Sequence, residues 1–338
     1  MNATSSWEVG SRSGLVSIGT HSLWLQAAGP KREPGDPAVV IITGLASCAA
    51  SWAAVVRLLG AHMRVYVYDR SGLGRSEPSA LLPTLSNICA ELGALLRAAG
   101  VGPPYIIVGH SRRWLTCLLG FWWGGILSRK FIVGREAEVA GMVFVEANQE
   151  QTLVRLDWRP ICHWFVKNEI DIQKVLGFPA RSKLTAAEWE QYQVDEAASY
   201  ANGQAAAEHA QYADSLRELG THRQLFRRPP YLASPVAVVI GSNAKDLRKL
   251  YDAVVAKNHA APEPELERQY RAFLDIFGRI DGLLQSEIAS LGAKSRVCQS
   301  LGGGHDVQLT DPGLIVDVVR WVIAVRDYRG GGGGEGSK

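Results

Sequence analysis

A serine in the first half of the chain stands where nucleophilic chemistry is feasible. Ser111 ends the sequence Gly-His-Ser at residues 109–111, directly after an apolar run at residues 105–108 that has the composition of a buried strand. Open α/β sheets expose their reactive groups at the carboxyl ends of such strands. A serine hydroxyl is a poor nucleophile near neutral pH and needs a histidine base, which an acid must orient. Ser111 therefore predicts a histidine and a carboxylate elsewhere in the chain.

One histidine has a setting that suits the role of base. His305 follows three glycines, residues 302–304, which come after the last strand-like run at residues 296–300. Glycine permits close approach of the backbone, so such a turn can hold an imidazole above the edge of a sheet. We therefore interpret Ser111 and His305 as a nucleophile and its base.

The segments that must position these two residues alternate between strand and helix. After a pair of edge strands that ends near residues 21–27, strand-like runs lie at residues 38–43, 64–68, 105–108, 140–145, 236–240 and 296–300. Helical spacing of apolar residues is found at 51–59, 85–99, 264–291 and 312–326. This alternation is typical of a mostly parallel sheet with right-handed crossovers and helices on both faces.

One long segment breaks the alternation. Residues 150–232 are polar, aromatic and helical in period, with no strand-like run, and the last residues, 329–338, are rich in glycine. We therefore predict an α/β core in two parts, residues 1–149 and 233–328, a helical insertion at 150–232, and a flexible tail at 329–338.

Four motifs in chain order resemble those of the α/β-hydrolase superfamily. They are the turn Thr43-Gly44-Leu45, the sequence DRSGLGRS at residues 69–76, Gly-His-Ser at 109–111, and the glycine-histidine pair at 304–305. The resemblance spans nearly the whole chain and implies an eight-stranded, mostly parallel sheet with a helical lid after strand 6. It also implies that Ser111 is the nucleophile and that two backbone N–H groups form the oxyanion hole. Those groups would belong to Leu45 and to Arg112, the residue after the serine.

The resemblance leaves two acids open. Glu146 closes the strand-like run before the insertion, where some members of the superfamily keep the catalytic acid. Many others keep it after the next strand, residues 236–240, about three residues beyond the strand-ending glycine. In this chain that glycine is Gly241, and the expected place holds Ala244. Since Asp246 comes two residues late, Glu146 is the preferred acid and Asp246 the alternative.

The sequence after the serine departs from the family pattern. The family reads Gly-x-Ser-x-Gly because the strained turn brings strand and helix into contact, but here the final glycine is replaced by Arg113. Joining Ser111 to Trp123 restores Gly-His-Ser-Trp-Gly-Gly, so the eleven residues 112–122 interrupt the motif. They are either a foreign segment, from an unremoved intron or a mistaken gene model, or a genuine insertion. A genuine insertion would lengthen the next helix by about three turns, roughly 16 Å, or form an apolar docking patch.

Composition excludes several other classes of protein. The chain has 338 residues, 47% hydrophobic and 20% charged, with a net charge of +3 and no basic stripe of the kind that nucleic acid requires. Its five cysteines are widely scattered, which argues against a disulfide framework or a zinc site. We expect no metal or organic cofactor, since no phosphate-cradling GxGxxG turn is present. The chain shows no membrane-length apolar run, and its start carries no apolar leader, so we expect a cytoplasmic protein.

The predicted function combines these features. Aromatic residues in the insertion predict an apolar roof over a medium-sized acyl group. We expect a serine-dependent hydrolase of a small-molecule carboxylic ester, thioester or lactone, similar to standalone hydrolases of secondary metabolism. A serine at this position argues against epoxide hydrolases, which use aspartate. The alternatives are a lyase or C–C hydrolase with the same triad, and a non-catalytic protein disabled by residues 112–122.

Overall fold

The central sheet has eight strands in the order β1-β2-β4-β3-β5-β6-β7-β8. The computed structural model describes residues 7–110, 123–258 and 263–327. The strands are β1 (Arg12–Ser17), β2 (Ser22–Ala28), β3 (Ala38–Ile42), β4 (Val65–Tyr68), β5 (Tyr105–His110), β6 (Val139–Val145), β7 (Val236–Ile240) and β8 (Ser295–Gln299). Strand β2 runs antiparallel to both β1 and β4, and the other neighbouring pairs are parallel. This is the α/β-hydrolase sheet that the sequence predicts.

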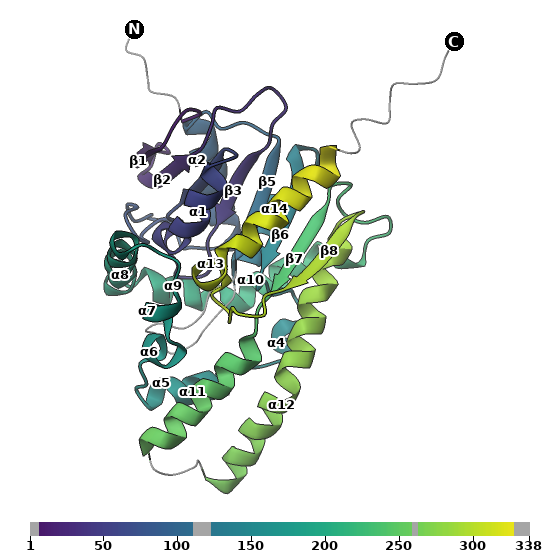
Figure 1. Cartoon of the computed structure of the whole chain (residues 1–338). Coiled ribbons are helices and arrows are strands. Elements are labelled where there is room, and N and C mark those ends of the chain that lie inside the picture. The colour runs from purple at the N-terminus through teal and green to yellow at the C-terminus, as the bar shows by residue number, and fades with distance from the viewer. Residues whose placement is uncertain (1–6, 111–122, 259–262, 328–338) are drawn as a thin grey trace.

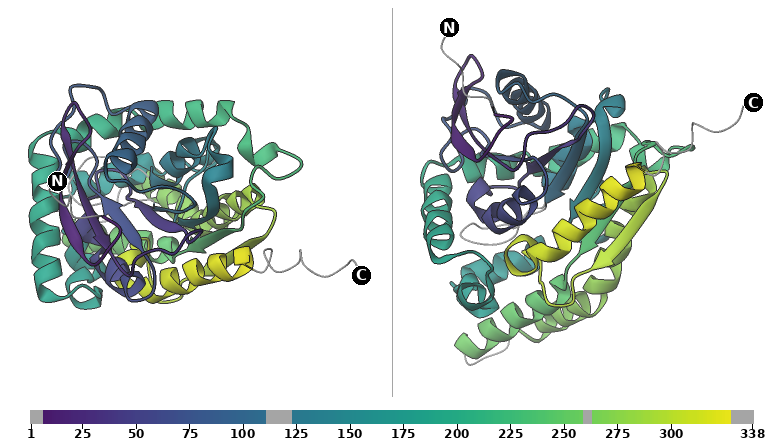
Figure 2. Two further views of the ribbon diagram at one scale, coloured as in Figure 1. Left: turned by 90° about the horizontal axis from the view of Figure 1, so that it is seen from above. Right: turned by 45° about the horizontal axis from the view of Figure 1, so that its top comes forward.

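Helices cover both faces of the sheet, so the inner strands are buried on both sides. The helices of the core are α1 (Ala53–Gly60), α2 (Leu85–Ala98), α3 (Gly124–Phe131), α11 (Asn243–Asn258), α12 (Pro264–Glu287), α13 (Val307–Thr310) and α14 (Pro312–Asp327). Val39 and Ile41 of β3 pack in one apolar cluster with α1 and α14, whereas Val40 and Ile42 pack in another with α2 and α3. Figure 2 shows the yellow helix α14 and the blue helix α2 on opposite sides of the sheet.

The segment between β6 and β7 is helical, as its period predicts. Its helices are α4 (Thr152–Arg155), α5 (Arg159–Lys167), α6 (Ile172–Leu176), α7 (Phe178–Arg181), α8 (Ala186–Ala201), α9 (Gln204–Ala210) and α10 (Tyr212–Thr221). We call this set the inserted helices. Figure 1 shows them below and beside the sheet, at the end where the parallel strands terminate. The division of the chain into domains, and the lid role of this segment, remain predictions.

Two long helices extend the same end of the molecule. Helices α11 and α12 pack against each other and project away from the sheet, and α11 contacts α5 and α6 (Figure 1). Helix α11 was not predicted from the sequence, although four of its apolar residues have helical spacing and are buried: Leu247, Leu250, Tyr251 and Val254. The helix predicted over residues 264–291 is α12 followed by a 3₁₀ turn at Ile288–Leu291. None of the helices within the described ranges is both long and apolar enough to cross a membrane.

Candidate active site

The carboxyl end of β5 carries the Gly-His-Ser motif. Ser111, Arg112 and the rest of residues 112–122 lie outside the described residues, as does the predicted tail at 329–338. Their neighbour His110 is fully buried. Its ring centroid lies 5.4 Å from that of Trp52 and 5.6 Å from that of His305, and its Nε2 atom is 3.5 Å from the carbonyl oxygen of His305. The residue before the candidate nucleophile is therefore in contact with the candidate base.

The helix after the motif begins in contact with β5. Helix α3 starts at Gly124, where an added Cβ would collide with the carbonyl oxygen of His110 and lie 2.9 Å from that of Ile42. Eleven further helical residues between strand and helix would separate them by about 16 Å. The interpretation that residues 112–122 lengthen the next helix concerns residues outside the described ones, and the described helix α3 begins at Gly124. Gly124 makes the close approach that the family requires of its second motif glycine.

His305 is held against a buried carboxylate. Its Nδ1 atom lies 2.7 Å from Oε2 of Glu146, and neither side chain is exposed. The turn before it needs glycine, because a Cβ on Gly304 would collide with the carboxylate of Asp246. A carboxylate that accepts the Nδ1 proton fixes the tautomer and orientation of an imidazole, and it stabilises the imidazolium form. This pair therefore has the geometry of a base and its orienting acid.

Glu146 is fixed by the elements on each side of it. It follows β6 with a φ of +52°, a left-handed conformation that costs a non-glycine residue about 1–3 kcal/mol. Its N–H donates to the Val239 carbonyl at 2.8 Å. Its Oε1 accepts hydrogen bonds from the N–H of Gly241 and, at 3.2 Å, from Nε2 of Gln285. These contacts offset the backbone strain and point the second carboxylate oxygen at His305.

Asp246 also touches His305, but through the main chain. Its Oδ2 accepts a hydrogen bond from the His305 backbone N–H at 3.2 Å, and the side chain is buried. Asp246 comes two residues later than the usual place of the acid, and it lies in the first turn of α11, which begins at Asn243. The structure thus brings both candidate acids to His305, with Glu146 at the ring and Asp246 behind the turn.

Two residues of α12 that were not predicted from the sequence complete the surroundings of Glu146. Gln285 Nε2 donates to Oδ2 of Asp281 at 3.0 Å as well as to Glu146. Asp281 is 3% exposed, and its burial, followed by the nearby charge of Glu146, raises its pKa well above the usual range. The available signal was a pair of polar residues four apart within the apolar face of an amphipathic helix.

The turn after β3 carries the predicted oxyanion donor Leu45. Ser47 N–H donates to the Gly44 carbonyl at 3.1 Å, and Thr43 Oγ1 donates to the Ser47 carbonyl at 3.0 Å. Ala46 has a φ of +53°. Leu45 is buried, and its N–H donates no hydrogen bond within the described residues. The turn therefore presents one backbone donor that the described part of the protein leaves available.

A second turn supports the first. Asp69, after β4, accepts hydrogen bonds from the N–H groups of Ala49 at 2.6 Å and Arg75 at 3.1 Å. Burial raises the pKa of Asp69 to about 6. The motif glycine Gly74 is required here, because a Cβ would collide with that carboxylate.

Among the described residues, no group of three His, Cys, Asp or Glu side chains could hold a metal ion.

Comparison with known proteins agrees with the sheet and the motifs. The sequence profile of the family described as "Alpha/beta hydrolase family" matches residues 39–318. This chain belongs to the alpha/beta hydrolase family. It is 31% identical over 343 residues to an "AB hydrolase superfamily protein" of Gibberella zeae, covering 94% of this chain and 98% of that one. It is also 31% identical over 330 residues to a "Probable transporter efuK" of Hormonema carpetanum.

The coverage of these relatives differs. The match to the Hormonema carpetanum protein takes in 96% of this α/β hydrolase but 44% of that protein, so the chain spans less than half of its length. Among solved structures, the carboxylesterase CesB of Bacillus subtilis has a TM-score of 0.53 and 15% identity, covering 94% of this chain and 93% of its own. That likeness shows the fold alone. Membership of the family supports hydrolase activity but does not identify the substrate.

Proposed function

We propose that this α/β hydrolase cleaves a small-molecule carboxylic ester, thioester or lactone through Ser111. The observation that carries the proposal is the fully buried contact of 2.7 Å between His305 Nδ1 and Glu146 Oε2, next to the residue that precedes the serine. Families that use this arrangement perform acyl transfer, because the histidine can both take and return a proton.

The proposed reaction has two halves. His305 takes the proton of the Ser111 hydroxyl as its oxygen attacks the acyl carbon, and the imidazolium formed is stabilised by Glu146. The N–H groups of Leu45 and Arg112 bind the resulting oxyanion, each contributing about 3 kcal/mol. The imidazolium then protonates the leaving alcohol or thiol. Water, deprotonated by His305, attacks the acyl-serine, and the imidazolium returns the proton to the Ser111 oxygen as its bond to the acyl carbon breaks, which releases the carboxylic acid.

The inserted helices are proposed to form a lid over an uncharged substrate. Asn148, just after Glu146, donates to the Tyr212 hydroxyl at 2.6 Å, which ties α10 to the loop that carries the acid. Two arginines of the insertion that could meet a substrate carboxylate already have partners. Arg155 lies 2.9 Å from Glu287, and Arg159 lies 2.7 Å from Asp157. A neutral acyl group, such as those of secondary metabolism, fits this distribution of charge.

The aromatic residues of the insertion mainly hold it together. Buried among them are Trp158, Phe165, Phe178, Tyr192 and Tyr212. Their packing makes the segment a stable body that can exclude water from an acyl-enzyme. The same triad supports lyase and C–C hydrolase chemistry, so p-nitrophenyl esters, lactones and diketones belong in one substrate panel.

A second function has a specific observation in its favour. Residues 112–122 separate Ser111 from Gly124, although Gly124 already occupies the close-contact position of the family motif. In a non-catalytic or disabled protein, this segment would displace the serine or the Arg112 N–H from the site.

A fluorophosphonate probe distinguishes the two functions. We expect labelling of the full chain that disappears in Ser111→Ala and persists in the control Ser290→Ala. Absence of labelling in the full chain, with labelling in a variant that lacks residues 112–122, would identify a hydrolase disabled by that segment. If neither chain is labelled and neither cleaves p-nitrophenyl esters of several chain lengths, the proposed hydrolase function is wrong.

A further inference from the structure

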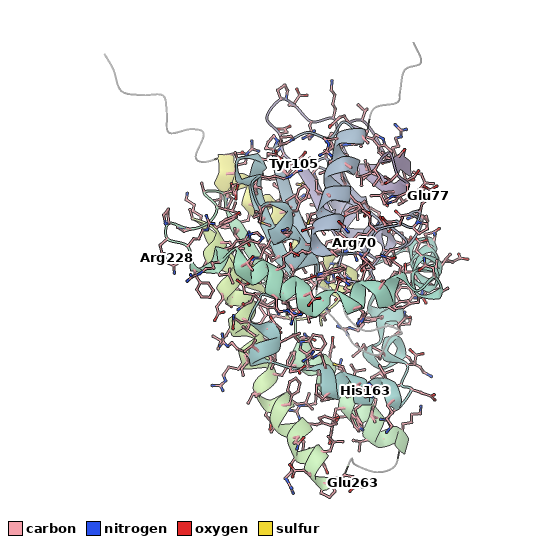
Figure 3. All side chains as sticks on the ribbon, turned by 180° about the vertical axis from the view of Figure 1, so that it is seen from behind. Arg70, Glu77, Tyr105, His163, Arg228 and Glu263 are labelled. Atoms are coloured by element: carbon pink, nitrogen blue, oxygen red, sulfur yellow. The ribbon has the colours of Figure 1, made fainter. Side chains whose placement is uncertain are left out.

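A buried ion pair joins the core to one of the inserted helices. Arg70, in the turn after β4, reaches Glu208 of α9 through two hydrogen bonds, Nε to Oε1 at 2.7 Å and Nη2 to Oε2 at 2.8 Å. The two side chains are 1% and 0% exposed. Figure 3 shows Arg70 where the core meets the inserted helices. Such bidentate pairs are geometrically specific and hold both partners in one arrangement.

The pair also holds the turn that carries Leu45. Arg70 Nη1 donates to the Thr43 carbonyl at 2.7 Å, and Nη2 donates to the Gly44 carbonyl at 2.7 Å. Glu208 Oε2 accepts the Ala46 N–H at 2.7 Å. Arginine and glutamate thus bind the peptide groups on the two sides of Leu45.

The contact with Gly44 determines the direction of the Leu45 N–H. The Gly44 carbonyl and the Leu45 N–H belong to one planar trans peptide group and point in opposite directions. When the guanidinium of Arg70 binds that carbonyl, the N–H must face away from Arg70. A cationic donor on the carbonyl also polarises the peptide, which strengthens its N–H as a donor.

Glu208 makes this arrangement depend on the insertion. The Ala46 N–H and the Arg70 guanidinium both lose a charged partner if α9 moves away. Helix α8 contacts the turn after β4. Its Ser199 Oγ accepts the Gly74 N–H at 2.9 Å, and Asn202 Nδ2, just after the helix, donates to the Gly72 carbonyl at 2.6 Å. The inserted helices therefore anchor on the two turns that shape the site.

We propose that Arg70 and Glu208 are positioning residues that orient the Leu45 N–H as an oxyanion donor, so that helix α9 completes the oxyanion hole. The inference rests on the proposed function of Ser111. Neither residue touches the reacting atoms. Both act through the peptide groups that flank Leu45.

The first test measures the geometry without any reaction. We compare amide hydrogen exchange of residues 43–48 in the full chain, in Glu208→Gln, and in the control Glu188→Gln, which alters the exposed pair of Glu188 with Arg57. Glu208→Gln should speed exchange in this segment at least tenfold, and the control should leave it unchanged. Unchanged exchange in Glu208→Gln overturns the inference whether or not Ser111 is reactive.

The second test measures catalysis. With p-nitrophenyl acetate, Glu208→Gln should lower kcat by about 10- to 100-fold with KM within about twofold, because only the transition state carries the oxyanion. Binding of an alkyl boronic acid, which forms a tetrahedral serine adduct, should weaken in parallel. A loss confined to KM, or a loss equal to that of Glu188→Gln, overturns the inference.

A paired variant separates positioning from folding. Arg70→Met combined with Glu208→Leu replaces the ion pair by apolar groups, a change that folded proteins often tolerate. We expect it to unfold near the temperature of the wild-type chain while kcat stays low. Recovery of full kcat in this variant contradicts the inference. If the wild-type chain is not labelled at Ser111, the proposed function fails and this role fails with it, while the exchange result still reports the link between α9 and the turn.

Discussion

The Nδ1 atom of His305 and the Oε2 atom of Glu146 lie 2.7 Å apart in a place where neither side chain meets solvent. The two residues follow different strands and are 159 positions apart in the chain. The other carboxylate oxygen of Glu146 is held by Gly241 after β7 and by Gln285 of α12. Glu146 follows β6, and its carboxylate contacts residues from the turn after β8, from the end of β7 and from α12. Such convergence is expected where a single orientation of an imidazole is required.

The charge of Glu146 can be removed with little change in shape. In Glu146→Gln the amide cannot stabilise an imidazolium, and kcat for a p-nitrophenyl ester should fall on the order of 10³- to 10⁴-fold. Steady-state kinetics on purified, folded variants measure this. Asp246→Asn is the matched control. Its amide oxygen can still accept the His305 N–H, so kcat should change less than about tenfold. A larger loss in the control would make Asp246 the acid.

Asp281 should make stability depend on pH. Its pKa is raised by burial and by the charge of Glu146, so the unfolded chain releases this proton at a lower pH than the folded protein does. Stability therefore falls as pH rises from about 4 toward the folded pKa. Asp281→Asn removes this dependence and should gain stability relative to wild type as pH rises. Thermal unfolding between pH 4 and 8 measures it, with the exposed Asp275→Asn as control. Parallel curves for Asp281→Asn and wild type would contradict the prediction.

The close approach of α3 to β5 leaves no room for a side chain. Gly124→Ala should cost about 1–3 kcal/mol or more, because the added Cβ collides with the His110 carbonyl. Gly313→Ala near the start of α14 is the matched control. Its Cβ would have nothing within 4 Å, and its effect should stay within about 0.5 kcal/mol. Denaturant unfolding of both variants measures the difference, and equal stabilities would show that α3 can shift.

A second buried ion pair ties α3 to the loop after β6. Arg129 Nη1 lies 2.6 Å from Glu150 Oε2, and Arg129 Nε donates to Gln224 Oε1 at 3.0 Å. Arg129→Met leaves a buried carboxylate without its cation and should cost about 3–5 kcal/mol. Adding Glu150→Leu should restore most of that loss. A double-mutant cycle from denaturant unfolding checks it, and additive losses would show that the two residues are not coupled.

Local patterns in the amino-acid sequence predict the order of the elements and the residue types of the site. Apolar runs with no alternation mark strands buried on both faces, and Gly-His-Ser and Gly-His follow two of those runs. These signals are local, because composition and turn glycines act within a few residues. They were sufficient for the fold, for the helical character of residues 150–232, and for naming Ser111 and His305 as candidates.

The choice of carboxylate that faces the His305 ring, and the surroundings of that carboxylate, depend on packing between distant elements. The direction of Glu146 depends on a left-handed φ and on donors from β7 and α12, while the early start of α11 directs Asp246 to the main chain. Glu208 reaches the Leu45 turn across 162 positions. Contacts of this kind arise from packing between distant elements, and side chains of the same type elsewhere in the chain have the same local sequence signal. The types and spacing of residues in the sequence therefore predict the kind of chemistry, and packing determines which side chains contact one another.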